Sequence, residues 1–486
     1  MGTVLTMATT TAPPGDSVHR LLPWLVAVAF FMQSLDTTIL NTAVPAIARA
    51  MDVTPLNVKS VLASYTLSLA VFIPVSGWMA DRFGTRRVFA AAIGLFTLGS
   101  VLCGLATSLE TLVACRVVQG MGGAMMMPVG RMTLARTFGK ADLVRVMSFV
   151  AIPSLVGPML GPVAGGLIVT YLDWRGVFYV NVPVGLLGLY FVQRYLPDYR
   201  EPRVPALDVA GLVLFGGGIA LVSYVLEVFG DHTHGVAAIL VMLGVSAALL
   251  AGYGIRALLT PFPLLNLGLF RVRTFRAAVS GGFFTRLGLG GIPFLFPLLY
   301  QIGLGFSPIV SGLLVLPQAI ASIGLKAFMP AILARLGYRT VLVGNTVVVG
   351  LMIMSFATVG THTPIWLIVG QAFVLGFFTS MQYTSMNTLV YADVSASQTS
   401  AASTIAATGQ QLAISFGVAG AALVAAIFVP AELHSHPAAI VHGVQQAFLA
   451  LGVLTILSSV VFMELKADDG AGMSNHDAAH HRQDEH

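Results

Sequence analysis

The chain alternates long apolar runs with short polar segments. Most of these runs contain about 20 residues, the length that an α-helix needs to cross the hydrocarbon core of a membrane. The pattern therefore predicts an all-α polytopic membrane protein with about fourteen transmembrane helices. The expected spans are residues 22–44, 58–79, 88–107, 110–132, 146–170, 177–195, 207–227, 236–257, 277–300, 309–331, 340–359, 364–390, 402–428 and 443–463.

The placement of Lys and Arg between these spans predicts the orientation. If the N-terminus is cytoplasmic, most of the 25 Lys and Arg residues fall in or beside inner segments, and few fall in outer ones. Cytoplasmic loops of membrane proteins carry such an excess of cations. We therefore expect a multi-pass plasma-membrane protein with both termini in the cytoplasm.

Composition supports the membrane assignment and narrows the function. The chain is 56% hydrophobic, against roughly 45–50% in soluble domains. Its net charge of +5 could suggest nucleic acid, but the cations lie in short loops, so topology explains them better. Cys103 and Cys115 lie in apolar runs without disulfide or metal spacing. No nucleophile and base converge, and the His-rich C-terminus has the polarity of a tail, so we predict neither an enzyme nor a metal site.

A weak internal repeat predicts two halves. The segment Ala334–Thr340 matches Asp81–Arg87 in its Arg and Gly positions, although the acid of the first copy is absent at Ala334. Transporters are often built from repeated helix bundles. The predicted division is a cytoplasmic tail (1–21), a six-helix bundle (22–195), a linker with two inserted helices (196–276), a second six-helix bundle (277–463) and a cytoplasmic His-rich tail (464–486).

Five sequence motifs, taken in order along the chain, resemble those of a known family. They are Leu35–Pro45, Gly77–Arg87, Arg116–Ala124, Gly157–Gly166 and Trp174–Gly185. Together they resemble the major facilitator superfamily, specifically its fourteen-span drug:proton antiporter branch (EmrB/QacA-type). The segments Phe31–Asp36, Leu299–Pro308 and Ser385–Thr388 look like those of MdtD-type members of that branch.

This resemblance implies a proton-coupled secondary transporter that exports drugs or metabolites by alternating access. It would reside in the bacterial inner membrane, act as a monomer, and use the proton gradient with no cofactor. Proton-coupled uptake of a metabolite is the alternative within transport. A membrane sensor or scaffold is the alternative from another class, but a sensor should carry a sizeable soluble domain, and no segment is long enough for one.

The resemblance also implies two moving parts. The charged segment between the second and third spans would act as a conformational latch, formed by Gly77, Asp81, Arg82, Gly84, Arg86 and Arg87. The fifth span would provide a gating seam of small and proline residues, formed by Gly157, Pro158, Gly161, Pro162, Gly165 and Gly166. Small residues permit close helix contact in membranes, so this span could also be simply a kinked, tightly packed helix.

Ionisable side chains inside a membrane are costly and therefore mark functional sites. Asp36 and Arg116 fall at similar depths when each helix rises about 1.5 Å per residue, so the two could meet. Burial favours the protonated form of a carboxyl and a nearby guanidinium favours the ionised form. Asp36 is thus our candidate proton carrier with Arg116 as its regulator, although a static structural ion pair is the other interpretation.

The remaining intramembrane cations predict the charge of the substrate. Arg286 lies near mid-depth of the ninth span, and Lys326 lies near the inner end of the tenth, where its amine could instead reach the interface. Three cations against one acid favour anionic or neutral substrates over lipophilic cations. Polar residues that could line the substrate path, or could simply join helices, include Gln33, Asn41, Gln119, Gln301 and Asn387.

Overall fold

A computed structural model describes residues 16–229, 235–395, 398–428 and 437–470, and the expected tails lie largely outside this part of the chain. The regular structure of the described residues is helical. In the first part of the chain it comprises α1 (Asp16–Ile39), η1 (Asn41–Ala43), α2 (Val44–Ala50), α3 (Lys59–Phe83), α4 (Thr85–Leu105), α5 (Leu109–Thr137), α6 (Lys140–Tyr171), α7 (Gly176–Tyr179), α8 (Asn181–Tyr195), α9 (Val209–Phe229) and α10 (Val236–Leu259).

The second part of the chain continues in the same way. It comprises η2 (Leu267–Arg271), α11 (Arg273–Gly290), α12 (Ile292–Pro297), the π-helical η3 (Leu298–Gly303), α13 (Pro308–Gly324), η4 (Leu325–Ala327), α14 (Met329–Ser355), η5 (Phe356–Thr358), α15 (Ile365–Leu389), α16 (Thr399–Ile427) and α17 (Pro437–Phe462). Among the described residues, 12 helical stretches are long and apolar enough to cross a membrane. Two shorter apolar stretches, Val156–Tyr171 and Pro308–Gly324, belong to α6 and α13.

Several predicted boundaries were wrong. The first span does not end as one helix, because α1 stops at Ile39 and the chain turns through η1 into α2. The ninth span continues through α12 and η3 to Gly303. The expected loop between the second and third spans is only a break at Gly84, because α3 runs to Phe83 and α4 starts at Thr85.

Gly84 makes this one-residue break possible. Its φ of 97° lies in the region that glycine adopts without strain. The second copy of the repeat behaves alike, since Gly337 has a φ of 70° and kinks α14 at the equivalent place. The weak sequence match therefore corresponds to a shared backbone feature.

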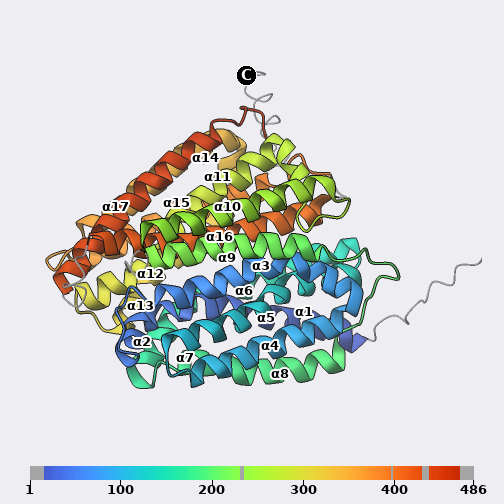
Figure 1. The fold of residues 1–486 in the computed structure, drawn as a ribbon, viewed down its shortest axis with the longest axis horizontal. Helices are drawn as coiled ribbons and strands as arrows, with labels where there is room; N and C mark the ends of the chain where they lie inside the picture. The colour runs from blue at the N-terminus through green and yellow to red at the C-terminus, as the bar shows by residue number, and fades with distance from the viewer. Residues whose placement is uncertain (1–15, 230–234, 396–397, 429–436, 471–486) are drawn as a thin grey trace, which may run out of the picture.

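Figure 1 shows the helices α1 to α8 gathered below and most of α11 to α17 above, with α9 and α10 running across the front between them and α12 and α13 at the left edge, level with α3 and α6. The lower group is held by contacts such as α1 with α6 and α4 with α5, and the upper by α14 with α17 and α13 with α15. The groups meet chiefly where α3 packs on α16 and where α6 packs on α13. Helix α9 contacts both α3 and α16, so it lies over the first of these seams.

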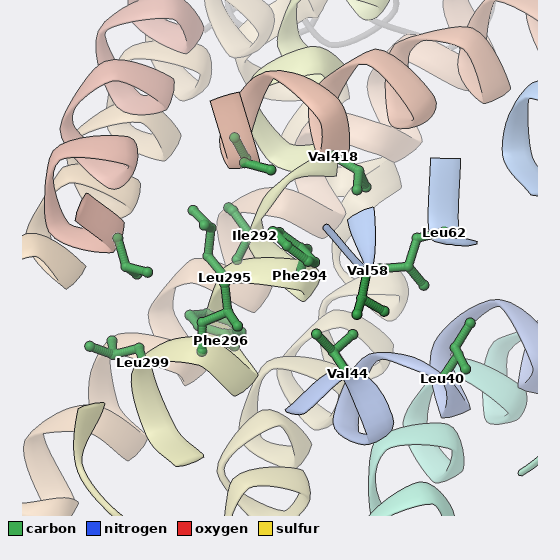
Figure 2. Close-up of a cluster of buried hydrophobic side chains, with 14 of the residues drawn as sticks. Leu40, Val44, Val58, Leu62, Ile292, Phe294, Leu295, Phe296, Leu299 and Val418 are labelled. Carbon is green, nitrogen blue, oxygen red and sulfur yellow. The ribbon is translucent and has the colours of Figure 1, made fainter. Parts of the chain in front are cut away.

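Apolar side chains join the two groups at one end of the molecule. A single buried cluster, the joint cluster, combines residues near the end of α1 and the start of α3 with residues of α12 and α16. Figure 2 shows Val44 and Val58 of this cluster beside Phe294, with Leu295 on the other side of that ring. At the other end two separate clusters form, one from the first helices and one mainly from α9 to α17. The two groups are thus closely packed at one end only.

Candidate functional site

A buried polar cluster surrounds Asp36, near the C-terminal end of α1. Its Oδ2 accepts a hydrogen bond from Arg116 Nη1 at 2.7 Å. Its Oδ1 accepts from Gln119 Nε2 and from Asn181 Nδ2, both at 2.8 Å. Asp36, Arg116 and Asn181 are each 1% exposed, and Gln119 is 0% exposed. The matching depths of Asp36 and Arg116 therefore do bring them together, as an ion pair without water contact.

Three helices position this cluster. Arg116 and Gln119 are three residues apart on α5, which places them on one helix face. The chain turns at Val180 between α7 and α8, so Asn181 opens α8 with its side chain toward α1. Arg116 also lies over the ring of Tyr65, 4.1 Å from its centroid. The guanidinium is therefore held on several sides and has little freedom to move away.

The hydrogen bonds of the cluster define the charge state of Asp36 in this structure. Both carboxylate oxygens accept from N–H donors, and a protonated carboxyl would need an acceptor for its own O–H. Gln119 cannot easily supply one, because its Oε1 already accepts from Arg116 at 2.6 Å. The arrangement fits an ionised Asp36.

A cavity of about 450 Å³ is lined by residues of α1 and α6 on one side and of α13 and α15 on the other. Its volume lies in the range of small-molecule sites. One part of the wall is apolar and includes Met159, Leu289 and Ile292. Another part carries hydroxyl, amide and amine groups from Asn41, Gln318, Ser322, Lys326, Thr379, Ser380, Tyr383, Thr384 and Asn387. The cavity can therefore hold an amphipathic molecule.

Arg286 stands behind the polar wall of this cavity. It is 6% exposed, donates from Nη2 to Asn387 Oδ1 at 2.6 Å, and lies 5.2 Å from the centroid of the Tyr383 ring. In the part of the chain that the structure describes, neither Arg286 nor Lys326 forms an ion pair with an acid. Two cations thus border the cavity, while Arg116 is neutralised by Asp36.

The other predicted path residues divide into two sets. Asn41 and Asn387 line the cavity. Gln119 instead belongs to the Asp36 cluster, and Gln301 donates from Nε2 to the backbone oxygen of Thr42 at 2.9 Å. Gln33 is buried on α1, and its Oε1 has no hydrogen-bond partner among the described residues. For Gln119 and Gln301 the helix-joining interpretation is the better one.

The predicted latch residues lie at the opposite end from the joint cluster. Arg136 of α5 donates from Nη2 to Asp81 Oδ1 and to Glu201 Oε1, both at 2.9 Å. Arg82, Arg86 and Arg87 are exposed, and Gly77 lies within α3. The segment after α8 is bonded to this region, because Thr85 exchanges hydrogen bonds with Tyr199. The contacts of Asp81 and Thr85 thus join α3, α4, α5 and the linker.

The predicted seam residues lie where α6 meets its two neighbours. A Cβ at Gly157 would come 2.8 Å from Ser34, and at Gly161 or Gly165 it would overlap Thr38 or Thr42. The opposite face of α6 contacts α13, where a Cβ at Gly166 would lie 2.5 Å from the backbone oxygen of Pro308. Pro158 lines the cavity. Pro162 also lines the cavity. A Cβ at Gly312 of α13 would overlap the Pro162 carbonyl oxygen, so the two helices are in close contact there.

Sequence reasoning missed several partners of these sites. Asn181 was visible within the Trp174–Gly185 motif, where a polar residue in an apolar run was a usable signal. Arg136 and Glu201 had no such signal, because charged residues at inner helix ends are common. Ser322 is an ordinary residue in a membrane helix, and only the cavity distinguishes it.

Comparisons with known proteins agree with the helical fold and the cavity between two groups of helices. The family model described as Major Facilitator Superfamily matches residues 26–418. A relative from Serratia proteamaculans, named as candidate multidrug resistance protein MdtD, is 38% identical over 449 residues, covering 92% of this chain and 93% of the relative. A protein of the same name from Salmonella heidelberg is 38% identical over 458 residues, covering 93% and 96%.

Solved structures share the fold at low sequence identity. The POT family transporter PepTSo gives a TM-score of 0.68 at 14% identity, covering 91% of this chain and 97% of that one. A D-xylose-proton symporter gives 0.66 at 15% identity, covering 93% and 99%. The family model covers most of the chain, and the relatives cover 92% and 93% of it. Both identify a membrane transporter and not an enzyme. The chain belongs to the Major Facilitator Superfamily and is a multi-pass membrane transporter of the MdtD type.

Proposed function

We propose that this protein exports anionic or neutral small molecules in exchange for protons. The observation that carries the proposal is the ion pair of Asp36 and Arg116, which is almost completely buried. Replacing a buried ion pair by apolar residues is often neutral or stabilising. A buried ion pair two residues before Thr38, which lines a substrate-sized cavity, suits a site that gains and loses a proton.

Alternating access would proceed between the two groups of helices. We infer fourteen spans, with α6 and α13 adding to the 12 longer stretches, arranged as two six-helix bundles around the inserted pair α9 and α10. Close packing at the joint cluster and separate packing at the other end suit a state that is closed to the outside and accessible from the cytoplasm. The close contacts of α6 with α1 and α13 suit a surface on which the bundles rock.

The charge of the cavity supports the substrate class. Arg286 has one neutral hydrogen-bond partner and no acid in the described residues, and Lys326 lines the same cavity. A buried cation without a counter-charge costs free energy. An anionic group of the substrate would supply the counter-charge and reduce that cost. The apolar wall around Leu289 and Ile292 would hold the rest of the molecule.

Four further features belong to the proposal. The direction is export, because the relatives are named for multidrug resistance. Charge placement favours cytoplasmic termini in a bacterial inner membrane. One chain contains the whole cavity, so a monomer suffices. The Asp81 latch would hold one end state, since its contacts with Arg136 lie at the end opposite the joint cluster.

The test uses purified protein in liposomes that contain a pH-sensitive dye, with a proton gradient imposed. Three probes of one shape and different charge are compared: naphthoate, naphthamide and naphthylmethylammonium. We expect proton flux that depends on the anion or the amide and is absent in the Asp36→Asn variant. Undiminished flux in that variant would exclude Asp36 as the carrier, and flux with the ammonium probe alone would reverse the assignment of substrate charge.

A further inference from the structure

The Asp36 cluster contains one neutral side chain whose hydrogen bonding can follow a proton. Asn181 donates from Nδ2 to Asp36 Oδ1 at 2.8 Å. Among the described residues, the Asn181 side chain makes this one hydrogen bond. Asn181 is 1% exposed, so bulk water does not compete for the amide. A carboxamide has a donor and an acceptor at nearly equal reach.

The other two partners of Asp36 cannot adapt in this way. Arg116 is a donor only, whatever the state of Asp36. Both the nitrogen and the oxygen of the Gln119 amide are hydrogen-bonded. Its Nε2 donates to Asp36 and to Ser100 Oγ at 2.8 Å each, and its Oε1 accepts from Arg116 at 2.6 Å. Rotating Gln119 would break these bonds together, whereas rotating Asn181 breaks one.

We propose that Asn181 is the positioning residue that lets Asp36 carry a proton, a role that rests on the proposed proton coupling. With Asp36 ionised, Asn181 donates through Nδ2, as the structure has it. When Asp36 gains a proton, the Asn181 amide turns by about 180° and its Oδ1 accepts the new O–H, because a buried hydroxyl without an acceptor is costly. No covalent bond other than the O–H of Asp36 changes.

The surroundings allow the effect of Asn181 to be isolated. The charged and titratable groups around Asp36 are Arg116 from α5, which pairs with it, Tyr65 from α3, which contacts Arg116, and Cys103 from α4, which contacts Gln119. The elements α7 and α8 contribute Asn181 and the ring of Phe178, which carry no charge. A substitution at Asn181 therefore changes hydrogen bonding to Asp36 and leaves the charges around it in place.

The experiment measures the protonation of Asp36 itself and needs no transported substrate. Purified protein in lipid is titrated with pH, and infrared difference spectra follow the C=O band of protonated carboxyl groups. The band of Asp36 is the one that the Asp36→Asn variant lacks. Hydrogen bonds to charged groups are stronger than those to neutral ones, so Asn181→Leu removes more support from the ionised form. We expect its band to appear at a pH about one unit higher than in the wild type.

The matched control is Asn345 on α14. It is also a buried asparagine that joins helices, donating from Nδ2 to Gln382 Oε1 at 2.7 Å and to the Phe378 oxygen at 2.9 Å. Asn345→Leu should leave the Asp36 midpoint unchanged. Asn181→Ser, which keeps a small group able to donate and accept, should give a smaller shift than Asn181→Leu and covers the case in which the leucine variant does not fold.

The outcomes separate this inference from the proposed function. If the Asp36 band titrates but neither variant at Asn181 moves its midpoint or its frequency, the role of Asn181 is wrong and the proton carrier stands. If the wild type shows no band that Asp36→Asn removes, Asp36 takes no proton and both proposals fail. An equal shift in Asn345→Leu would mean a general structural effect and would also overturn the role of Asn181.

Discussion

The buried ion pair makes a quantitative prediction about stability. Arg116→Met keeps an unbranched apolar stem but removes the guanidinium and its charge, so Asp36 remains buried with only Gln119 and Asn181 as donors. The N–O distance of 2.7 Å corresponds to an attraction of about 6 kcal/mol at an effective dielectric constant of roughly 20. The two remaining donors offset part of this loss. Breaking a buried pair costs about 3–5 kcal/mol, and we expect a loss of that size.

A double-mutant cycle isolates the interaction. Asp36→Asn alone leaves Arg116 buried without a counter-charge, so it should cost about as much as Arg116→Met. The double variant removes both charges and should cost less than the sum by at least about 2 kcal/mol. The free energy of unfolding is measured in mixed micelles of dodecylmaltoside and SDS, with tryptophan fluorescence as the signal.

An exposed ion pair provides the control for this cycle. Arg175 and Asp173 are 3.4 Å apart and are 36% and 61% exposed, so Arg175→Met should change stability by about 1 kcal/mol or less. If the effects of Arg116→Met and Asp36→Asn simply add to within about 0.5 kcal/mol, or if Arg116→Met costs no more than Arg175→Met, the reasoning about the buried pair is refuted.

Three further predictions follow from other parts of the structure. Gly161→Leu overfills the contact of α6 with Thr38 and should cost about 1–3 kcal/mol and abolish transport of naphthoate in liposomes, whereas Gly244→Leu, with nothing within 4 Å of its Cβ, should do neither. Arg286→Gln should slow naphthoate transport about tenfold or more and improve transport of the ammonium probe; unchanged charge preference would contradict the role of this cation. Burial by itself would raise the pKa of Asp208, but hydrogen bonds from Arg256, at 2.6 Å, and from the Gly211 N–H outweigh it and lower that pKa. The stabilisation is therefore present above about pH 4 and lost as pH falls through the lowered value, so thermal unfolding midpoints of the wild type and Arg256→Gln should differ at pH 7 and converge in acid.

Hydropathy was sufficient to predict a polytopic helical membrane protein, because it is a local property of the chain, whereas the expectation of transport came from the resemblance of the motifs to a known family. A run of apolar residues identifies a membrane span whatever it packs against. Depth within the membrane follows from counting residues along a helix, and this is why Asp36 and Arg116 could be paired in advance. The repeat of Gly84 at Gly337 was likewise visible in the sequence, since glycine at such a turn is required by local backbone geometry.

The tertiary structure decided which side chains meet around each site. Membrane helices such as α5 and α6 carry apolar residues on nearly all sides, so their sequences do not indicate which face turns toward which neighbour. Successive residues of a helix point about 100° apart, and a small rotation would exchange the partners of Gln119, Asn181 or Arg286. The residues that share a depth were therefore predictable from the sequence. Their choice of partner depended on helix rotation, which is set by packing between segments far apart in the chain.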